Sequence, residues 1–129
     1  MEPPHSVLVV DDQAPFRLAA RAVLRRSAGF EFVGEAGNGV EALALASELR
    51  PDVVLMDINM PEMGGIEATR RIVADLPETF VILCSTYDVE DLPPDATTSG
   101  ARAYVNKEQF GATTLQRLWD QRGGAGFAI

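Results

Sequence analysis

Residues 53–57 read Val-Val-Leu-Met-Asp, a short apolar run that ends in a carboxylate. Two runs of the same kind flank it along the chain, Val7–Val10 and Phe80–Cys84. Unbroken apolar runs rich in β-branched residues are typical of strands that are buried on both faces of a parallel sheet. Two weaker runs, Phe32–Ala36 and Ala103–Val105, predict further strands nearer the edges of that sheet.

Apolar residues at helical spacing occupy four stretches between and after these runs, residues 15–27, 39–50, 65–75 and 110–121. Asn38 and Glu41 form an N-terminal capping pattern for the second stretch. The alternation of strands and helices predicts an α/β fold with a single doubly wound, five-stranded parallel sheet. We expect the flavodoxin-like strand order 2-1-3-4-5, with helices on both faces of the sheet.

The helix expected between the fourth and fifth strands has an unfavourable sequence. Pro93 and Pro94 stand in the middle of residues 88–100, and proline is incompatible with the interior of a helix. We therefore predict that this fourth helix is short, shifted or replaced by a loop. At best, one turn starts near Pro94 and stops at Gly100.

Length and composition are those of an ordinary globular protein. The 129 residues fit one domain, expected over residues 1–121, followed by a glycine-rich and flexible tail over residues 122–129. Eleven basic and 19 acidic residues give a net charge of −8, which argues against direct binding to nucleic acids. No apolar run is long enough for a membrane span, and no signal peptide is evident. The only cysteine, Cys84, allows no intramolecular disulfide. We therefore expect a cytoplasmic protein.

Polar residues stand where the predicted strands end. Asp11 and Asp12 follow the first strand, Asp57 the third, Ser85 the fourth, and Lys107, the only lysine, the fifth. We expect these side chains to converge, because the carboxyl ends of parallel strands meet at one edge of the sheet. Three carboxylates in one pocket repel each other and raise each other's pKa, and Mg²⁺ would relieve this repulsion.

These residue types suit phosphoryl transfer. A carboxylate can attack phosphorus and form an aspartyl phosphate, Mg²⁺ and Lys107 would neutralise the phosphoryl charge, and the Ser85 hydroxyl would donate a hydrogen bond. Thr86 competes with Ser85 for this role, and the apolar run that ends just before Ser85 favours Ser85. Purely structural roles are the alternatives: helix capping for Asp11 and Asp12, a turn for Ser85 and a solvated side chain for Lys107.

Taken together, the motifs resemble the receiver domains of two-component response regulators. The resemblance extends from residue 6 to about residue 121 and rests on four stretches: Val7–Asp12, Asp57–Gly65, Ile82–Ser85 and Gly100–Lys107. The stretch Ser85–Asp88 and the pair Lys107–Glu108 are most similar to receivers of the LuxR type, which precede a helix-turn-helix DNA-binding domain.

The resemblance implies that Asp57 is the phosphoacceptor, with a phosphohistidine on a sensor histidine kinase as donor and small acyl phosphates as substitutes. It implies Mg²⁺ as the cofactor, bound at Asp57. Asp12 would hold the ion directly, and Asp11 mainly through water or at longer range. The backbone carbonyl of Asn59 would complete the set of protein ligands.

The same resemblance implies a switch that involves three residues. Ser85 would be the switch hydroxyl, Tyr104 the switch aromatic and Lys107 the phosphate-pairing lysine. The alternative for Tyr104 is a packing residue of the fifth strand. Asn59 and Tyr87 occupy positions that influence how fast the phosphate is lost. Such a domain is a phosphoacceptor switch and does not turn over an external substrate.

Two departures from the family pattern concern partners. The Pro93–Pro94 pair puts the usual partner surface in doubt but not the phosphorylation site, and Glu108 stands where many relatives have proline. We expect a downstream output domain or protein as a second partner. Either a monomer or a phosphorylation-dependent homodimer is compatible with the sequence.

Two other functions compete with the switch. The first is an interaction module of receiver fold that no longer depends on phosphorylation; the interrupted fourth helix favours it, and the complete acidic triad argues against it. The second is an aspartate-nucleophile hydrolase, a class that resembles Asp-x-Asp at the strand end. Here the second position is Asn59, which predicts no turnover of a phosphoester.

Overall fold

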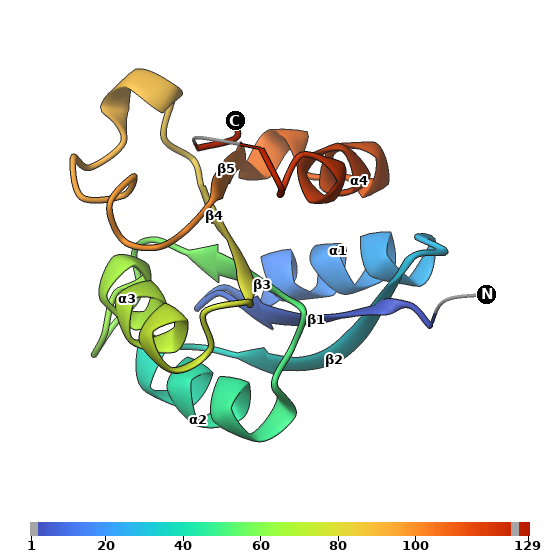
Figure 1. Cartoon of the computed structure of the whole chain (residues 1–129), viewed down its shortest axis with the longest axis horizontal. Coiled ribbons are helices and arrows are strands. Elements are labelled where there is room, and N and C mark those ends of the chain that lie inside the picture. The colour runs from blue at the N-terminus through green and yellow to red at the C-terminus, as the bar shows by residue number, and fades with distance from the viewer. Residues whose placement is uncertain (1–2, 125–126) are drawn as a thin grey trace.

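The computed structural model describes residues 3–124 and 127–129, and in these residues five parallel strands form one sheet in the order β2-β1-β3-β4-β5 (Figure 1). The strands are β1 (His5–Val10), β2 (Phe30–Ala36), β3 (Val53–Asp57), β4 (Phe80–Ser85) and β5 (Ala103–Asn106). The α-helices are α1 (Ala14–Arg25), α2 (Gly39–Leu49), α3 (Gly65–Asp75) and α4 (Ala112–Asp120). The predicted fold class and strand order are confirmed.

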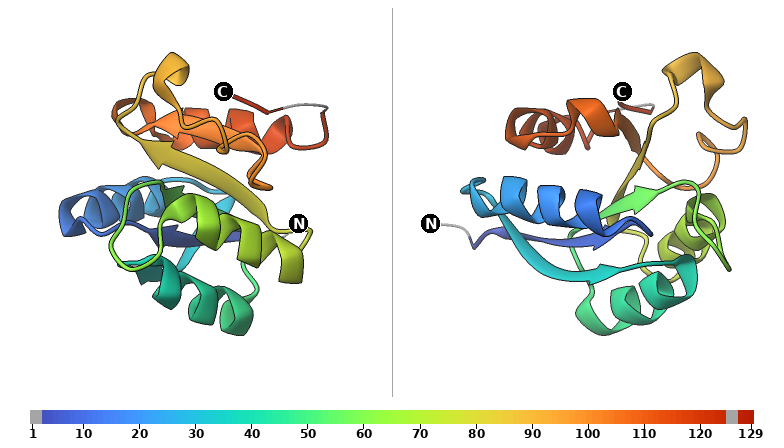
Figure 2. Two further views of the ribbon diagram at one scale, coloured as in Figure 1. Left: turned by 90° about the vertical axis from the view of Figure 1, so that its left-hand side faces the viewer. Right: turned by 180° about the vertical axis from the view of Figure 1, so that it is seen from behind.

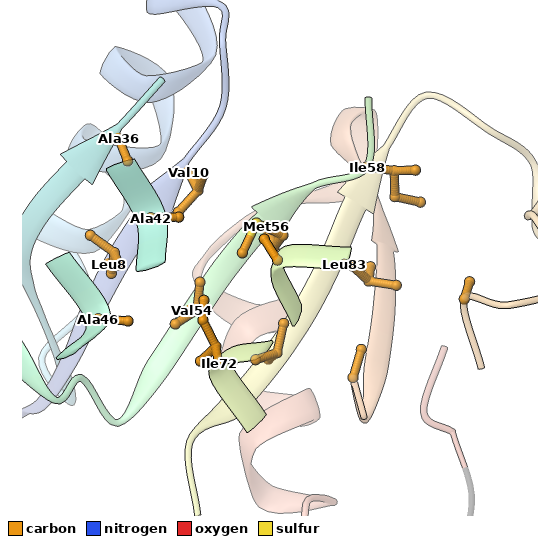
Figure 3. Close-up of a cluster of buried hydrophobic side chains, with 14 of the residues drawn as sticks. Leu8, Val10, Ala36, Ala42, Ala46, Val54, Met56, Ile58, Ile72 and Leu83 are labelled. Carbon is orange, nitrogen blue, oxygen red and sulfur yellow. The ribbon is translucent and has the colours of Figure 1, made fainter. Parts of the chain in front are cut away.

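Helices cover both faces of the sheet, α2 and α3 on one side and α1 and α4 on the other (Figure 1, Figure 2). Alternate residues of each central strand therefore enter different cores. Leu8 and Val54 pack with α2 and α3, as Figure 3 shows, whereas Val7 and Val53 pack with α1 and α4. Each fully buried aliphatic side chain contributes about 1.5–3 kcal/mol of transfer free energy.

Local chemistry sets the helix boundaries close to the predicted ones. Asn38 Oδ1 accepts the backbone N–H of Glu41 at 2.8 Å, which starts α2. The helix ends at Leu49 because Arg50 takes a left-handed conformation, with φ of 46°, just before Pro51. The last helix begins two residues later than predicted, at Ala112, because Lys107–Gln109 first form a 3₁₀ turn.

A loop connects β4 and β5, where the sequence predicted a helix that is short, shifted or replaced by a loop. Its one helical piece among the described residues is the 3₁₀ turn η1 (Val89–Asp91), which ends before the two prolines. Leu92, directly before Pro93, is extended, as expected for a residue that precedes proline. Further along, hydrogen-bonded turns anchor the loop, and Ala96 is buried against the same core as α2 and α3. The expectation of a disrupted fourth helix is confirmed.

The flexibility expected of the tail, residues 122–129, stays a prediction, and residues 125–126 lie outside the described residues. The last residues of the tail contact the sheet. Ala128 forms a parallel bridge with Ala103 on the free edge of β5, and Phe127 packs against the core that contains Tyr104. The C-terminus accordingly lies beside β5 in Figure 1. Among the described residues, none of the helices is both long and apolar enough to cross a lipid bilayer.

Candidate functional site

Three carboxylates meet at the carboxyl ends of β1 and β3. The two strands are neighbours, with Val10 opposite Met56, so Asp11 and Asp12 arrive next to Asp57. One oxygen of each carboxylate lies within 4.8 Å of the others. The predicted convergence of Asp11, Asp12 and Asp57 is therefore present in the structure.

Lys107 reaches the same pocket from the end of β5. Its Nζ lies 2.7 Å from Asp11 Oδ2 and 3.5 Å from Asp57 Oδ1. The Nζ also lies 5.0 Å from the centre of the Phe16 ring, within the range of a cation–π contact. The Lys107 side chain is only 13% exposed, which rules out a solvated surface lysine. The only lysine of the chain is thus a counter-charge for two buried aspartates.

The pocket raises the pKa of Asp57 from its ordinary value of 3.8 to about 6. Burial is the main cause, and the negative charge of Asp11 adds to it, while Lys107 acts in the opposite direction. Burial also works against the charge of Lys107, but its hydrogen bond to Asp11 and the charge of Asp57 outweigh this and raise its pKa. One ammonium does not balance three carboxylates, so the pocket retains excess negative charge.

This donor set fits a hard divalent cation. Mg²⁺ prefers a few carboxylate oxygens and keeps several waters, and Asp12 is exposed enough to leave room for them. Asn59 lies two residues after Asp57 in the loop that leads to α3, and its side-chain amide donates to the Tyr87 hydroxyl at 3.0 Å. That the backbone carbonyl of Asn59 binds Mg²⁺ stays a prediction.

Ser85, the last residue of β4, and Tyr104 of β5 form a buried hydrogen-bonded pair. Ser85 Oγ lies 2.9 Å from the Tyr104 hydroxyl, which also donates toward the backbone carbonyls of Tyr87, at 2.6 Å, and Ser85, at 3.1 Å. Tyr104 is 1% exposed. Thr86, the competitor for the hydroxyl role, is exposed, so burial favours Ser85. In the described residues the Ser85 hydroxyl contacts Tyr104 and the Tyr87 amide.

Two features of the site escaped the sequence analysis. Arg17 donates to the backbone carbonyl of Asp11 at 2.6 Å and pairs with Glu35 at 2.6 Å, which ties the acidic loop to the end of β2. Its place six residues after Asp11, on the first helix, is the signal that could have revealed it. A Cβ on Gly65 would lie 1.9 Å from the carbonyl oxygen of Asp57, so this glycine lets α3 approach the strand end closely.

Comparison with known proteins identifies the family. The family model of the response regulator receiver domain matches residues 7–118. The chemotaxis protein CheY of Thermotoga maritima is 41% identical over 101 residues, which cover 78% of this chain and 83% of that protein. The response regulator GacA of Pseudomonas aeruginosa is 40% identical over 101 residues, 78% of this chain but only 47% of GacA.

A solved structure supports the same assignment across nearly the whole chain. It is a two-component response regulator of the LuxR family from Aurantimonas sp. SI85-9A1, with a TM-score of 0.85, 30% sequence identity, and coverage of 98% of this chain and 90% of that one. The predicted similarity to LuxR-type receivers is therefore confirmed. The chain belongs to the receiver domains of two-component response regulators, a family of phosphoacceptor switches that bind Mg²⁺ at an acidic pocket and interact with histidine kinases and output domains.

Proposed function

We propose that Asp57 accepts a phosphoryl group from a sensor histidine kinase in a Mg²⁺-dependent reaction. The observation that carries this proposal is the contact of Lys107 Nζ with both Asp11 and Asp57, at 2.7 and 3.5 Å. A lysine in this position can pair with a phosphoryl group on Asp57 while it keeps its contact with Asp11.

The metal would be held by Asp12 and Asp57 directly, by Asp11 at longer range or through water, and by the Asn59 backbone carbonyl. When bound, Mg²⁺ would neutralise phosphoryl oxygens and align them with the attacking carboxylate. It would also lower the pKa of Asp57, which burial and Asp11 raise, and so keep this carboxylate ionised at neutral pH.

The transfer itself needs an ionised Asp57. One of its carboxylate oxygens attacks phosphorus, a P–O bond forms, and the P–N bond of the phosphohistidine breaks with its electron pair leaving to the imidazole. Lys107 Nζ pairs with one phosphoryl oxygen as the negative charge moves onto Asp57. The pocket has no second acid or base at position 59, where Asn59 stands, so no turnover of an external phosphoester follows.

The switch would begin at Ser85. Its hydroxyl hydrogen bonds to Tyr104 in this structure, at 2.9 Å, and a phosphoryl group on Asp57 would offer it a stronger, charged acceptor. Tyr104 would then lose one of its partners, and the surface around β5 would change. This surface would serve a downstream output domain or protein, or a phosphorylation-dependent homodimer.

Intact mass spectrometry after incubation with acetyl phosphate and Mg²⁺ tests the proposal. The parent is expected to gain one phosphoryl group, and Asp57→Asn none. Asp75→Asn is the matched control, because Asp75 is an exposed aspartate at the end of α3, away from the pocket; this variant should be labelled like the parent. A parent that stays unlabelled under conditions that label another receiver would favour the phosphorylation-independent module instead.

A further inference from the structure

The outer edge of β5 is occupied by another part of the same chain. Since β5 is the last strand of the sheet, the backbone groups on its side away from β4 have no neighbouring strand to pair with. The Ala128 amide donates to the Arg102 carbonyl at 2.9 Å, and the Tyr104 amide donates to the Ala128 carbonyl at 2.8 Å. Residues 127–129, which we call the strap, thus form one isolated parallel bridge with β5, between Ala128 and Ala103.

Two further contacts hold the strap in place. Arg117 of α4 donates to the backbone carbonyl of Ile129 at 3.2 Å. Phe127 packs against the core on the face where the helix between β4 and β5 is missing. The strap therefore adds Phe127 to the apolar core on this face, and it pairs with part of the free edge of the sheet.

One residue links the strap to the pocket. The backbone N–H of Tyr104 binds Ala128, and the side-chain hydroxyl of Tyr104 binds Ser85 Oγ. Lys107, three residues along from Tyr104, lies on the acidic pocket. A phosphoryl group on Asp57 would attract both Ser85 and Lys107. Lys107 would then draw the end of β5 toward β3, which is away from the outer edge where the strap lies.

We propose that the outer edge of β5 is a strand-addition surface held by the chain's own residues 127–129, and that phosphorylation of Asp57 releases this strap. The inference rests on the proposed function, because it needs a phosphoryl group at Asp57. It goes beyond that function by naming the structural element that the switch moves. The surface set free consists of the Arg102 carbonyl, the Tyr104 amide and the apolar area beneath Phe127.

Amide hydrogen exchange measured by NMR tests the release. Mg²⁺ with beryllofluoride serves as a lasting phosphoryl mimic. The amides of Tyr104 and Ala128 should exchange about tenfold faster or more with the mimic than without it, within the range typical of coupled sites. The Arg102 amide is the internal control, because it donates to Val81 of β4 at 3.0 Å and not to the strap, and its exchange should stay unchanged.

A pair of variants tests occupancy of the edge without phosphorylation. Ala128→Pro removes the amide that donates to Arg102 and should make the Tyr104 amide exchange fast even without the mimic. Ala128→Ser keeps both backbone hydrogen bonds and should resemble the parent. Because coupling is reciprocal, Ala128→Pro should also bind Mg²⁺–beryllofluoride more tightly than the parent does. The expected increase in affinity equals the factor by which the mimic speeds exchange of the Tyr104 amide in the parent.

The possible failures are distinguishable. If acetyl phosphate labels the parent and the mimic binds, but Tyr104 and Ala128 exchange as before, strap release is wrong and the proposed function stands. If Ala128→Pro leaves the Tyr104 amide protected, the strap does not occupy the edge. If the parent takes up neither phosphoryl group nor mimic, the proposed function fails and the strap proposal fails with it.

Discussion

At the scale of single residues, the pocket places charge where it costs stability. Asp57 has a pKa raised to about 6, mainly by burial, so the folded chain retains a proton where the unfolded chain has lost it. Stability from this group is therefore highest at low pH and falls as pH rises from about 4 to about 6. Above that pH range the ionised Asp57 carboxylate lowers the free energy of unfolding of the metal-free protein.

Asp57→Asn should consequently stabilise the metal-free protein. The amide keeps the shape of the side chain and removes both the buried charge and its repulsion with Asp11, so we expect a gain of about 1–3 kcal/mol in the free energy of unfolding at pH 7. Urea unfolding followed by circular dichroism measures it, with Asp75→Asn as the control. The gain should be smaller at pH 4, where Asp57 of the parent is protonated. A variant that is less stable than the parent at pH 7 would contradict the inference that the charge of Asp57 destabilises the fold.

Lys107→Gln should have the opposite effect. It would leave the fully buried Asp11 without its cation, which costs about 2–4 kcal/mol of stability, as when a buried ion pair loses one partner. The pKa of Asp57 should rise further, because Lys107 lowers it in the parent. Urea unfolding and a carboxyl ¹³C titration measure the two effects. Arg25→Gln, at an exposed position on α1, is the control, and equal stability of the two variants would refute a buried role for Lys107.

At the scale of elements, the loop between β4 and β5 is held by specific anchors. Ser99 Oγ donates to the Ala96 carbonyl at 2.7 Å and accepts the Ala101 amide at 3.2 Å. Gly100 follows with φ of 102°, and a Cβ there would lie 3.1 Å from Val73 of α3. The loop is thus an ordered substitute for a helix, and its position depends on one left-handed glycine.

Gly100→Ala should therefore destabilise the fold by about 1–3 kcal/mol, since a side chain at this φ is strained and the contact with Val73 is tight. Thermal unfolding gives the difference. Gly123→Ala is the matched control, because a Cβ at Gly123 meets nothing within 4 Å and its φ is not positive. If both variants unfold at the parent's temperature, the loop tolerates rearrangement and its anchors are unimportant.

The elements that the sequence predicted are those governed by local pattern. β-branched runs such as Val7–Val10 and Val53–Met56 specify buried strands, and strand ends in a parallel sheet specify where Asp11, Asp57 and Lys107 meet. The proline pair predicted the missing helix for the same local reason.

Features that depend on long-range geometry could not be predicted in this way. The bond from Tyr104 to the Tyr87 carbonyl depends on how the loop after β4 approaches β5, and the hydrogen bond from Arg17 to the Asp11 carbonyl depends on a side-chain rotamer. The pairing of Ala128 with β5 joins residues far apart in sequence through backbone groups, which all residues share. No side-chain pattern reports such a contact.

At the scale of the whole molecule, the two ends of the sheet differ in the residues they bring together. The acidic pocket lies at the carboxyl ends of the strands. Trp119 lies at the amino ends, where its ring is centred 4.2 Å from His5, the first residue of β1, and 5.9 Å from Phe80, the first residue of β4. The tryptophan therefore reports on the packing of the fold and not on the pocket.

Mg²⁺ should accordingly leave the native emission of Trp119 unchanged and still protect it against unfolding. A ligand that binds only the folded state stabilises the whole cooperative unit, by about 2.7 kcal/mol at a concentration 100 times its Kd. Urea unfolding followed by Trp119 fluorescence should thus shift to higher urea with Mg²⁺ in the parent. Asp57→Asn should show a smaller shift, because a metal ligand is lost, and Asp75→Asn a full one. Equal shifts in all three proteins would place the bound cation outside the pocket, whereas a change in native emission alone would mean that the two ends of the sheet are coupled within the folded state.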